Sequence, residues 1–271
     1  MGQQAAGWVA RPRVQRVNAV KSMQDLPGQE ALCRPDRGLL RTHLLYPMLL
    51  FLLVAGVVEH FHLDLILADA LYHVEGDRWA LKKHFITATV VHEYGRHVVQ
   101  LLVFLVVGLI IRDWRQGRRR QLAADWYLFA CFAITTLTVS LLRHLTHVTC
   151  PWDLLRYGGD TPYVSIFARL PPGTEAGACF PAGHASGAYA WVALYYYFRV
   201  VSPRYRWYGL AFGLMLGLTF DIAQQLRGAH FVSHGLWTLG IAWCVATGAY
   251  LITLKKKCRN RSLDGAQRNP G

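Results

Sequence analysis

Cys179-Phe-Pro-Ala-Gly-His-Ala-Ser186 and Arg227-Gly-Ala-His-Phe-Val-Ser-His234 are the two stretches around which the chain is organised. Each places histidine beside glycine and other small residues at the edge of a long apolar run. Titratable groups are costly to keep at a membrane boundary, so clusters of them on separate segments indicate a shared functional site. We expect the rest of the sequence to be the scaffold that brings the two stretches together.

Long apolar runs make up most of that scaffold. Of the 271 residues, 53% are hydrophobic and 17% are charged, whereas soluble domains carry about 25% charged residues. A helix that spans a bilayer needs ~20 mostly apolar residues. The runs that fit are residues 44–58, 97–111, 126–142, 184–198, 207–226 and 236–254. The sequence therefore predicts an all-α polytopic membrane protein, with a bundle of six transmembrane helices over residues 44–254.

The segments between and around these runs have distinct compositions. Residues 62–96 mix charged side chains with tryptophan and phenylalanine, which is typical of helices that lie at the membrane interface. Residues 143–183 form a polar, glycine- and proline-rich connection. Residues 1–43 and 255–271 are expected to be basic tails, and no secretory signal is visible in the first of them.

The positive charges predict the orientation of the chain. Six spans put both tails on one side, together with the loops at 112–120 and 199–206, and these four segments hold 21 of the 29 lysines and arginines. Cytoplasmic loops carry such an excess. We therefore expect cytoplasmic termini in a bacterial inner membrane, with both histidine stretches on the outer, periplasmic side. Because the net charge of +13 sits in short blocks between apolar runs, the sequence argues against a nucleic-acid partner.

Three polar segments meet on the predicted outer side. They are residues 143–153, residues 181–184 and residues 227–234. Together they supply arginine, which binds phosphate with two parallel hydrogen bonds, and glycine, which lets backbone N–H groups approach an anion. They also supply histidine, which acts as a nucleophile or a general acid near neutral pH. Phosphoryl transfer uses all three kinds of group.

These segments resemble the three motifs of the type 2 phosphatidic acid phosphatase (PAP2) superfamily of integral membrane phosphatases. The family pattern is Lys-x6-Arg-Pro, Pro-Ser-Gly-His and Ser-Arg-x5-His-x3-Asp, in that order. This chain has Arg143-x6-Cys150-Pro151, then Pro181-Ala-Gly-His184, then a third motif that ends in His230-x3-His234. The resemblance covers about residues 125–254. The substitutions in the first and third motifs place the chain in a divergent branch.

The resemblance implies catalytic roles for three histidines. His230 would attack phosphorus and become a phosphohistidine, and His184 would protonate the leaving oxygen. His234 stands where the family has an aspartate that orients the nucleophile. A neutral imidazole stabilises a neighbouring imidazolium less than a carboxylate does, so Asp153 and Glu93 remain alternatives for that role.

The resemblance also implies how phosphate is held. Arg143 and Arg227 would bind the phosphate oxygens, helped by the backbone at Gly183 and Ala185. The family arginine lies six residues before the nucleophile, where this chain has Gln224. Arg227 lies one helical turn away on roughly the same side, and so would substitute for it. The family requires no metal or other cofactor.

Two cysteines accompany these motifs. Cys150 takes the place of a family arginine, and Cys179 stands two residues before Pro181. Both lie on the predicted outer, oxidising side, where disulfides form. We expect a disulfide between Cys150 and Cys179 that pins the first motif to the second.

Other interpretations of these residues are less favoured. His230 and His234 at i, i+4 also match a metal-binding pair, but no glutamate lies between them and no third ligand is evident. The histidines outside the motifs are expected to be interfacial polar residues or, for His43, part of the tail. The interfacial set is His60, His62, His73, His84, His92, His97, His144 and His147.

The sequence thus predicts a metal-independent phosphatase in the membrane. It would hydrolyse a lipid phosphate monoester or diphosphate through a phosphohistidine at the outer face. One alternative is a phosphotransferase that passes the phosphate to a second lipid. The other is a lipid-binding or transport protein that has lost catalysis with the family aspartate and arginine.

Overall fold

The computed structural model describes residues 38–166, 168–169, 172–173 and 176–255. Most of the two predicted tails, residues 1–37 and 256–271, therefore lies outside the described part of the chain. Within the described residues the chain is helical and contains no strand. The α-helices are α3 (Tyr46–His60), α4 (Leu63–Val74), α5 (Gly95–Arg115), α6 (Arg119–Thr146), α7 (Gly183–Tyr189), α8 (Leu194–Val201), α9 (Arg206–Leu226) and α10 (Val232–Ala249).

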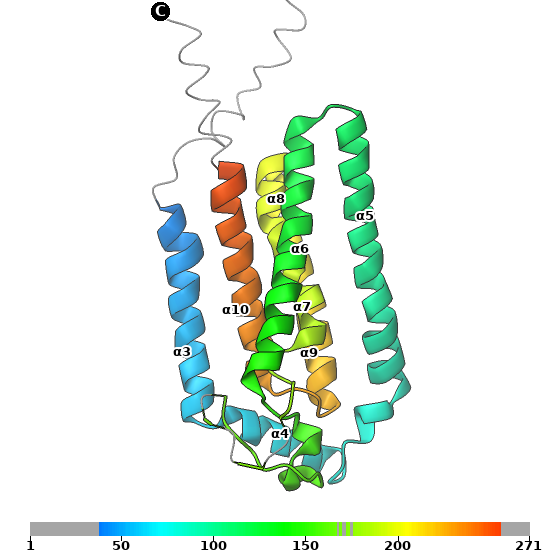
Figure 1. Ribbon diagram of the computed structural model, residues 1–271, viewed down its shortest axis with the longest axis vertical. Coiled ribbons are helices and arrows are strands. Elements are labelled where there is room, and N and C mark those ends of the chain that lie inside the picture. The colour runs from blue at the N-terminus through cyan, green and yellow to red at the C-terminus, as the bar shows by residue number, and fades with distance from the viewer. Residues whose placement is uncertain (1–37, 167, 170–171, 174–175, 256–271) are drawn as a thin grey trace, which may run out of the picture. The chain divides into compact units, whose positions relative to one another are not determined.

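Five helical segments of the described chain are long and apolar enough to cross a membrane. They are Arg41–His60, Phe85–Arg115, Arg119–Asp153, Pro203–Leu226 and Val232–Thr253. They run side by side as a bundle (Figure 1). The prediction of an all-α membrane protein is therefore confirmed.

The remaining expected span, residues 184–198, is an interrupted helix inside the same bundle. The chain passes from α7 through a 3₁₀ turn, Ala190–Ala193, into α8, so it is not one continuous α-helix. Every residue from Ala188 to Ala193 is buried. Figure 1 shows this segment beside α6 and α9. The bundle thus has five continuous membrane-length helices and one broken segment at its centre.

A row of glycines on α9 lets that broken segment pack closely. Gly209, Gly213 and Gly217 recur at intervals of four and therefore lie on one face of α9. A Cβ at Gly213 would overlap the backbone of residues 191 and 192, and one at Gly217 would overlap the ring of Tyr189. Helices in membranes associate through small residues of this kind, because they let two backbones approach.

Buried tyrosines tie α6 and α8 to α10. The Tyr127 hydroxyl donates to the Ala246 carbonyl at 3.0 Å, and Tyr196 shares a 2.8 Å hydrogen bond with the Thr247 hydroxyl. Both rings belong to the main hydrophobic core between these helices and α7. The core therefore lies in the C-terminal part of the chain and fixes the residues that follow Gly183.

Two expected boundaries differ from the structure. The expected interfacial segment, residues 62–96, lies outside the bundle only as far as about residue 83. Within this part, α4 lies across one end of the bundle (Figure 1). Residues Phe85–Tyr94 form a π-helical segment that continues directly into α5, so the second span begins at 85 and not at 97. The polar side chains that suggested interfacial helices lie, from residue 85 on, at the end of this spanning segment, where His92 contacts Gln224. Similarly, α6 extends to Thr146, so Arg143 lies in a helix and not in the 143–183 connection.

Candidate active site

The three motifs meet at the end of the bundle that α4 covers. Cys150 and Cys179 form a disulfide, with Cα atoms 5.2 Å apart. The Arg143 Nε donates to the Ala178 carbonyl at 2.7 Å, and the Thr146 hydroxyl donates to the Phe180 carbonyl at 2.6 Å. These contacts hold the residues before α7 against the last turn of α6, and they bring the first motif to the second.

The third motif places His230 next to His234. The two Nδ1 atoms are 3.2 Å apart, and His230 and His234 are only 8% and 1% exposed. Since one nitrogen must donate and the other accept, the pair shares one proton between the Nδ1 atoms. If that proton is on His230, its Nε2 carries a free lone pair, which is the arrangement a nucleophile requires.

The surroundings of His230 keep its ring neutral. Burial lowers the pKa of His230 to about 3, and the positive charge of Arg143 acts in the same direction. His184 and His92 lower this pKa further, while the Cys179 carbonyl opposes the shift. A neutral imidazole is the nucleophilic form. Charged or titratable groups from α6, α7 and the Phe85–Tyr94 segment therefore lie within electrostatic range of His230.

His184 lies at the start of α7 between two rings. Its imidazole stacks on Phe220 of α9, with ring centroids 4.8 Å apart and planes at 13°, and its centroid lies 4.2 Å from that of the His92 ring. The buried His184 Nε2 has no hydrogen-bond partner within the described part of the chain. Buried polar atoms are normally paired, so this nitrogen is a candidate for a proton donor or acceptor toward a ligand.

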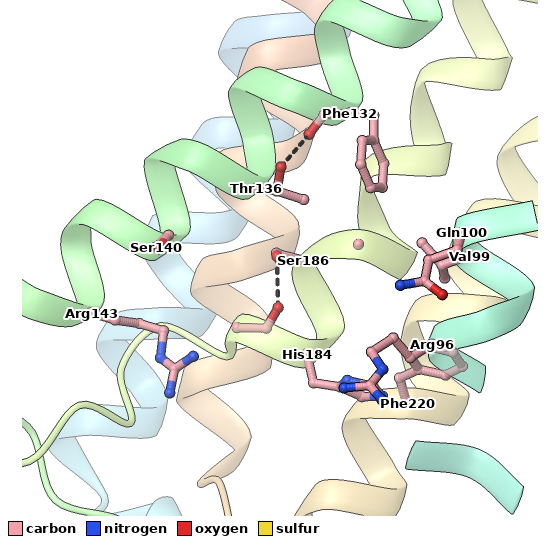
Figure 2. A pocket seen from close by; sticks show the side chains of 12 residues that line it. Arg96, Val99, Gln100, Phe132, Thr136, Ser140, Arg143, His184, Ser186 and Phe220 are labelled. Atoms are coloured by element: carbon pink, nitrogen blue, oxygen red, sulfur yellow. Dashed lines mark hydrogen bonds between the residues drawn. The ribbon is translucent and has the colours of Figure 1, made fainter. Parts of the chain in front are cut away.

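A pocket of about 330 Å³ opens beside His184. Figure 2 shows its wall on α6, where Arg143, Ser140, Thr136 and Phe132 follow one helix face from the charged end to the apolar end. The other walls come from α5, α7 and α9. Their lining residues are Arg96, Val99, Gln100, Gly183, His184, Ser186, Gly187 and Phe220. The pocket therefore combines two guanidinium groups and an imidazole at one end with an apolar surface deeper in the bundle.

The start of α7 is closely fitted to Arg143. A Cβ at Gly183 would overlap the Arg143 guanidinium, so only glycine allows this approach. The Ser186 N–H donates to the Ala182 carbonyl at 3.2 Å. The N–H groups of Gly183, His184 and Ala185 precede this first bond and are therefore the helix N–H groups that an anion can use.

Arg227 lies at the end of α9 and is held by two acceptors. Its Nε donates to the Lys82 carbonyl at 3.0 Å, and its NH1 donates to the Gln224 Oε1 at 3.2 Å. Gln224 in turn contacts His92, with 2.7 Å between its Nε2 and the His92 Nδ1. Burial lowers the pKa of Arg227, and the charge of Glu93 opposes that shift. Arg227 is therefore linked to His92 by hydrogen bonds through Gln224.

The acid that stabilises the third motif comes from α4. Asp64 is 5% exposed and accepts the Ser233 backbone N–H at 2.9 Å and the Ser233 hydroxyl at 2.5 Å. Burial raises the pKa of Asp64, although both hydrogen bonds from Ser233 oppose the shift. Ser233 lies in the first turn of α10, where a carboxylate interacts favourably with unpaired N–H groups. Asp64 thus fixes the turn that carries His234.

The two other acids considered for orienting His230 lie elsewhere. Asp153 is exposed and accepts a hydrogen bond from the Trp152 indole at 2.9 Å, and Glu93 is also exposed. His234 is the residue with a ring nitrogen at hydrogen-bond distance from His230. Among the residues that the structure describes, no three His, Cys, Asp or Glu side chains gather closely enough to hold a metal ion.

Four residues of this site were not expected from the motifs. They are His92, Arg96, Gln224 and Asp64, and all but Gln224 come from helices that precede the resemblance. His92 was grouped with the interfacial histidines, because nothing in its sequence neighbourhood marks it. The density of charged residues in 62–96 was the available signal, and it suggested an interface instead.

Comparison with protein families identifies the C-terminal part of the chain. Residues 124–258 match the model of the PAP2 superfamily. This part of the chain belongs to the PAP2 superfamily. The match begins in α6 and includes all three motifs, so the family suggested by the motifs is confirmed. Searches of curated proteins and of solved structures gave no match.

Proposed function

We propose that this PAP2 protein is a membrane phosphatase that hydrolyses a lipid phosphate monoester or diphosphate through a phosphohistidine at His230. The observation that carries the proposal is the His230–His234 contact of 3.2 Å between Nδ1 atoms. With the shared proton on the His230 Nδ1, this contact leaves the His230 Nε2 available for attack. Arg143 and His184, the other residues that the chemistry needs, lie close enough to shift the pKa of His230.

The geometry supports a two-step reaction. In the first step the His230 Nε2 forms a bond to phosphorus while the bond from phosphorus to the leaving oxygen breaks. His184 donates a proton to that oxygen. In the second step water attacks phosphorus, His184 takes a proton from the water, and the P–N bond breaks to release phosphate. Each histidine returns to its starting state.

His234 takes the role that the orienting aspartate has in the family. When His230 is phosphorylated, positive charge develops on its ring. The His234 Nδ1 then accepts a hydrogen bond from the His230 Nδ1–H. A neutral acceptor gives less stabilisation than a carboxylate. The hydrogen bonds from Ser233 to Asp64 hold the turn that carries His234, so the acceptor is kept at a fixed distance.

The pocket supports an amphiphilic substrate. Its two guanidinium groups suit a phosphate, and its Phe132 end suits an apolar chain within the bundle. We place the site at the outer, periplasmic face of a bacterial inner membrane with cytoplasmic termini, on the basis of the positive-charge distribution. Phosphatidic acid, phosphatidylglycerol phosphate, polyprenyl diphosphate and lipid A phosphates are the substrates to test.

Phosphate release by the detergent-purified full chain tests this function. Wild type and His230→Ala are compared on that panel, with EDTA or vanadate added. We expect release that survives EDTA, falls with vanadate and drops at least about a thousandfold in the variant. Transfer of labelled phosphate to a second lipid without release would favour the phosphotransferase. Full activity in His230→Ala, or none in wild type, would reject the proposal.

A further inference from the structure

His92, Gln224 and Arg227 form a hydrogen-bonded chain that ends beside His184. Arg227 lies at one end and can only donate hydrogen bonds. Its 3.2 Å contact therefore requires the oxygen of the Gln224 side chain on that side. The amide nitrogen of Gln224 must then face His92, where the structure places it 2.7 Å from Nδ1. Arg227 thus determines the orientation of the Gln224 amide.

The orientation of Gln224 determines the protonation state of His92. An amide nitrogen donates, so the His92 Nδ1 must accept and cannot carry a hydrogen. This excludes both the imidazolium and the Nδ1–H tautomer, and it leaves the neutral ring with its proton on Nε2. Arg227, Arg96 and Glu93 are the charged neighbours that act on the ring, and His184 is its titratable neighbour.

A neutral His92 has a direct consequence for His184. The two ring centroids are 4.2 Å apart, and two positive charges at that distance disfavour each other. If His92 were protonated, His184 would lose its proton. Because Gln224 keeps His92 neutral, His92 places no positive charge beside His184 when His184 takes up a proton. Phe220 also stacks on His184 and helps to fix the position of its ring.

We infer that His92 and Gln224 are positioning residues, which hold the His184 ring in place and keep the acid proton of the pair on His184. The inference rests on the proposed function, since it concerns the same site. It gives the residue at 224 a role that differs from phosphate binding. It also extends the site to the Phe85–Tyr94 segment, which lies outside the part that matches the family.

Kinetics of four variants in the full chain test the inference. Gln224→Glu keeps an acceptor for Arg227 but offers a carboxylate to the His92 Nδ1, and so favours the His92 imidazolium. We expect at least about a tenfold loss in kcat, which equals a 1.4 kcal/mol effect, with KM within about twofold. His92→Phe retains the ring contact without a charge and should stay within about threefold of wild type. His92→Ala removes the contact and should lose about tenfold.

The double variant gives the decisive comparison. In Gln224→Glu with His92→Phe, position 92 cannot be charged, so we expect kcat to recover to within about threefold of His92→Phe alone. His97→Phe, an exposed histidine one turn further along the same helix, is the matched control and should leave kcat unchanged. A double variant no better than Gln224→Glu, or His92→Phe as impaired as His92→Ala, would overturn the inference.

A spectroscopic measurement separates this inference from the proposed function. ¹⁵N spectra of histidine-labelled protein with inorganic phosphate report the tautomer of each ring, and His92→Phe and His184→Phe assign the two signals. We expect neutral His92 with Nε2–H and a protonated His184, and a charged His92 in Gln224→Glu. A protonated His92 in wild type would refute the inference, whether or not the protein releases phosphate. Absent turnover with the expected tautomers would refute the proposed function alone.

Discussion

The helices before residue 119 and those after it differ in how far they are buried. In the most apolar stretch of the α3 and α5 segments, 6% and 11% of the residues are buried inside the protein. In the corresponding stretches of the α9 and α10 segments, 39% are buried. The second group contains the match to the PAP2 superfamily and most of the core. The first group nevertheless contributes Asp64, His92 and Arg96 to the site. Most of the apolar surface of these helices is not buried inside the protein, but several of the contacts they make are polar and involve the segments that carry the motifs.

This difference indicates a division of roles. The C-terminal helices hold His184, His230 and His234 by close packing, which the chain cannot lose without unfolding. The N-terminal helices add hydrogen bonds around those residues and so adjust their charge and position. We expect changes in the C-terminal helices to remove activity, and changes in the N-terminal helices to reduce it or to weaken the fold locally.

The largest effect is expected from His184 in the C-terminal part. His184→Gln keeps a polar side chain but cannot donate a proton as an acid. Loss of a general acid lowers the rate by about 10²- to 10⁴-fold, so we expect kcat to fall in that range with little change in KM. Steady-state kinetics on an active lipid phosphate measure this. A substrate whose leaving group needs no proton, such as a nitrophenyl phosphate, should show a smaller loss, and an equal loss would argue against the acid role.

The disulfide between Cys150 and Cys179 should stabilise the same part of the chain. It closes a loop with a sequence separation of 29, for which the chain-entropy model gives roughly 3 to 4 kcal/mol. We expect reductant, or Cys150→Ser with Cys179→Ser, to lower the thermal midpoint in detergent. Intact mass after alkylation checks the pairing. Two alkylated thiols at these positions without reductant would show that no disulfide forms.

A smaller loss of stability is expected from Asp64 in the N-terminal part. Asp64→Ala leaves the Ser233 N–H and hydroxyl without a partner, and hydrogen bonds to a buried charged group contribute about 1.5 to 3 kcal/mol. Thermal unfolding should register this loss, and kcat should fall because the turn that carries His234 is released. Asp64→Asn is the matched control, since its amide still accepts from the Ser233 N–H. If both variants behave like wild type, α4 has no influence on the site.

The pH dependence of stability provides the finest test. The pKa of His230 is about 3 in the folded chain and about 6.5 when unfolded. The unfolded state therefore binds more protons between these values, and stability falls as the pH drops from about 6.5 toward 3. The contribution of His230 approaches ~1.4 kcal/mol per pH unit. We expect His230→Gln to flatten the decline in thermal midpoint between pH 6 and pH 4. An unchanged slope would mean that the ring of His230 is not buried as a neutral group.

The family and the fold class could be predicted from local patterns. Motif spacing assigns His184 to the second motif and His230 to the third, because the family's order of motifs survives even where Cys150, Gln224 and His234 replace its usual residues. The six apolar runs could be recognised because a helix that crosses a bilayer needs a known length of mostly apolar chain. The interruption at Ala190–Ala193 was not visible, because a 3₁₀ turn and an α-helical turn have the same apolar composition.

By itself the sequence determined that the chain is an all-α membrane protein of the PAP2 superfamily, with its motif histidines at the ends of apolar helices. Hydrophobicity and motif spacing are local properties, so they can be read along the chain. Only the tertiary structure decided which polar residues join those histidines. Asp64 contacts Ser233 across 169 positions, and His92 contacts Gln224 across 132. Such contacts depend on how helices pack in three dimensions, and no local pattern at His92 distinguishes it from the other histidines near the membrane boundary.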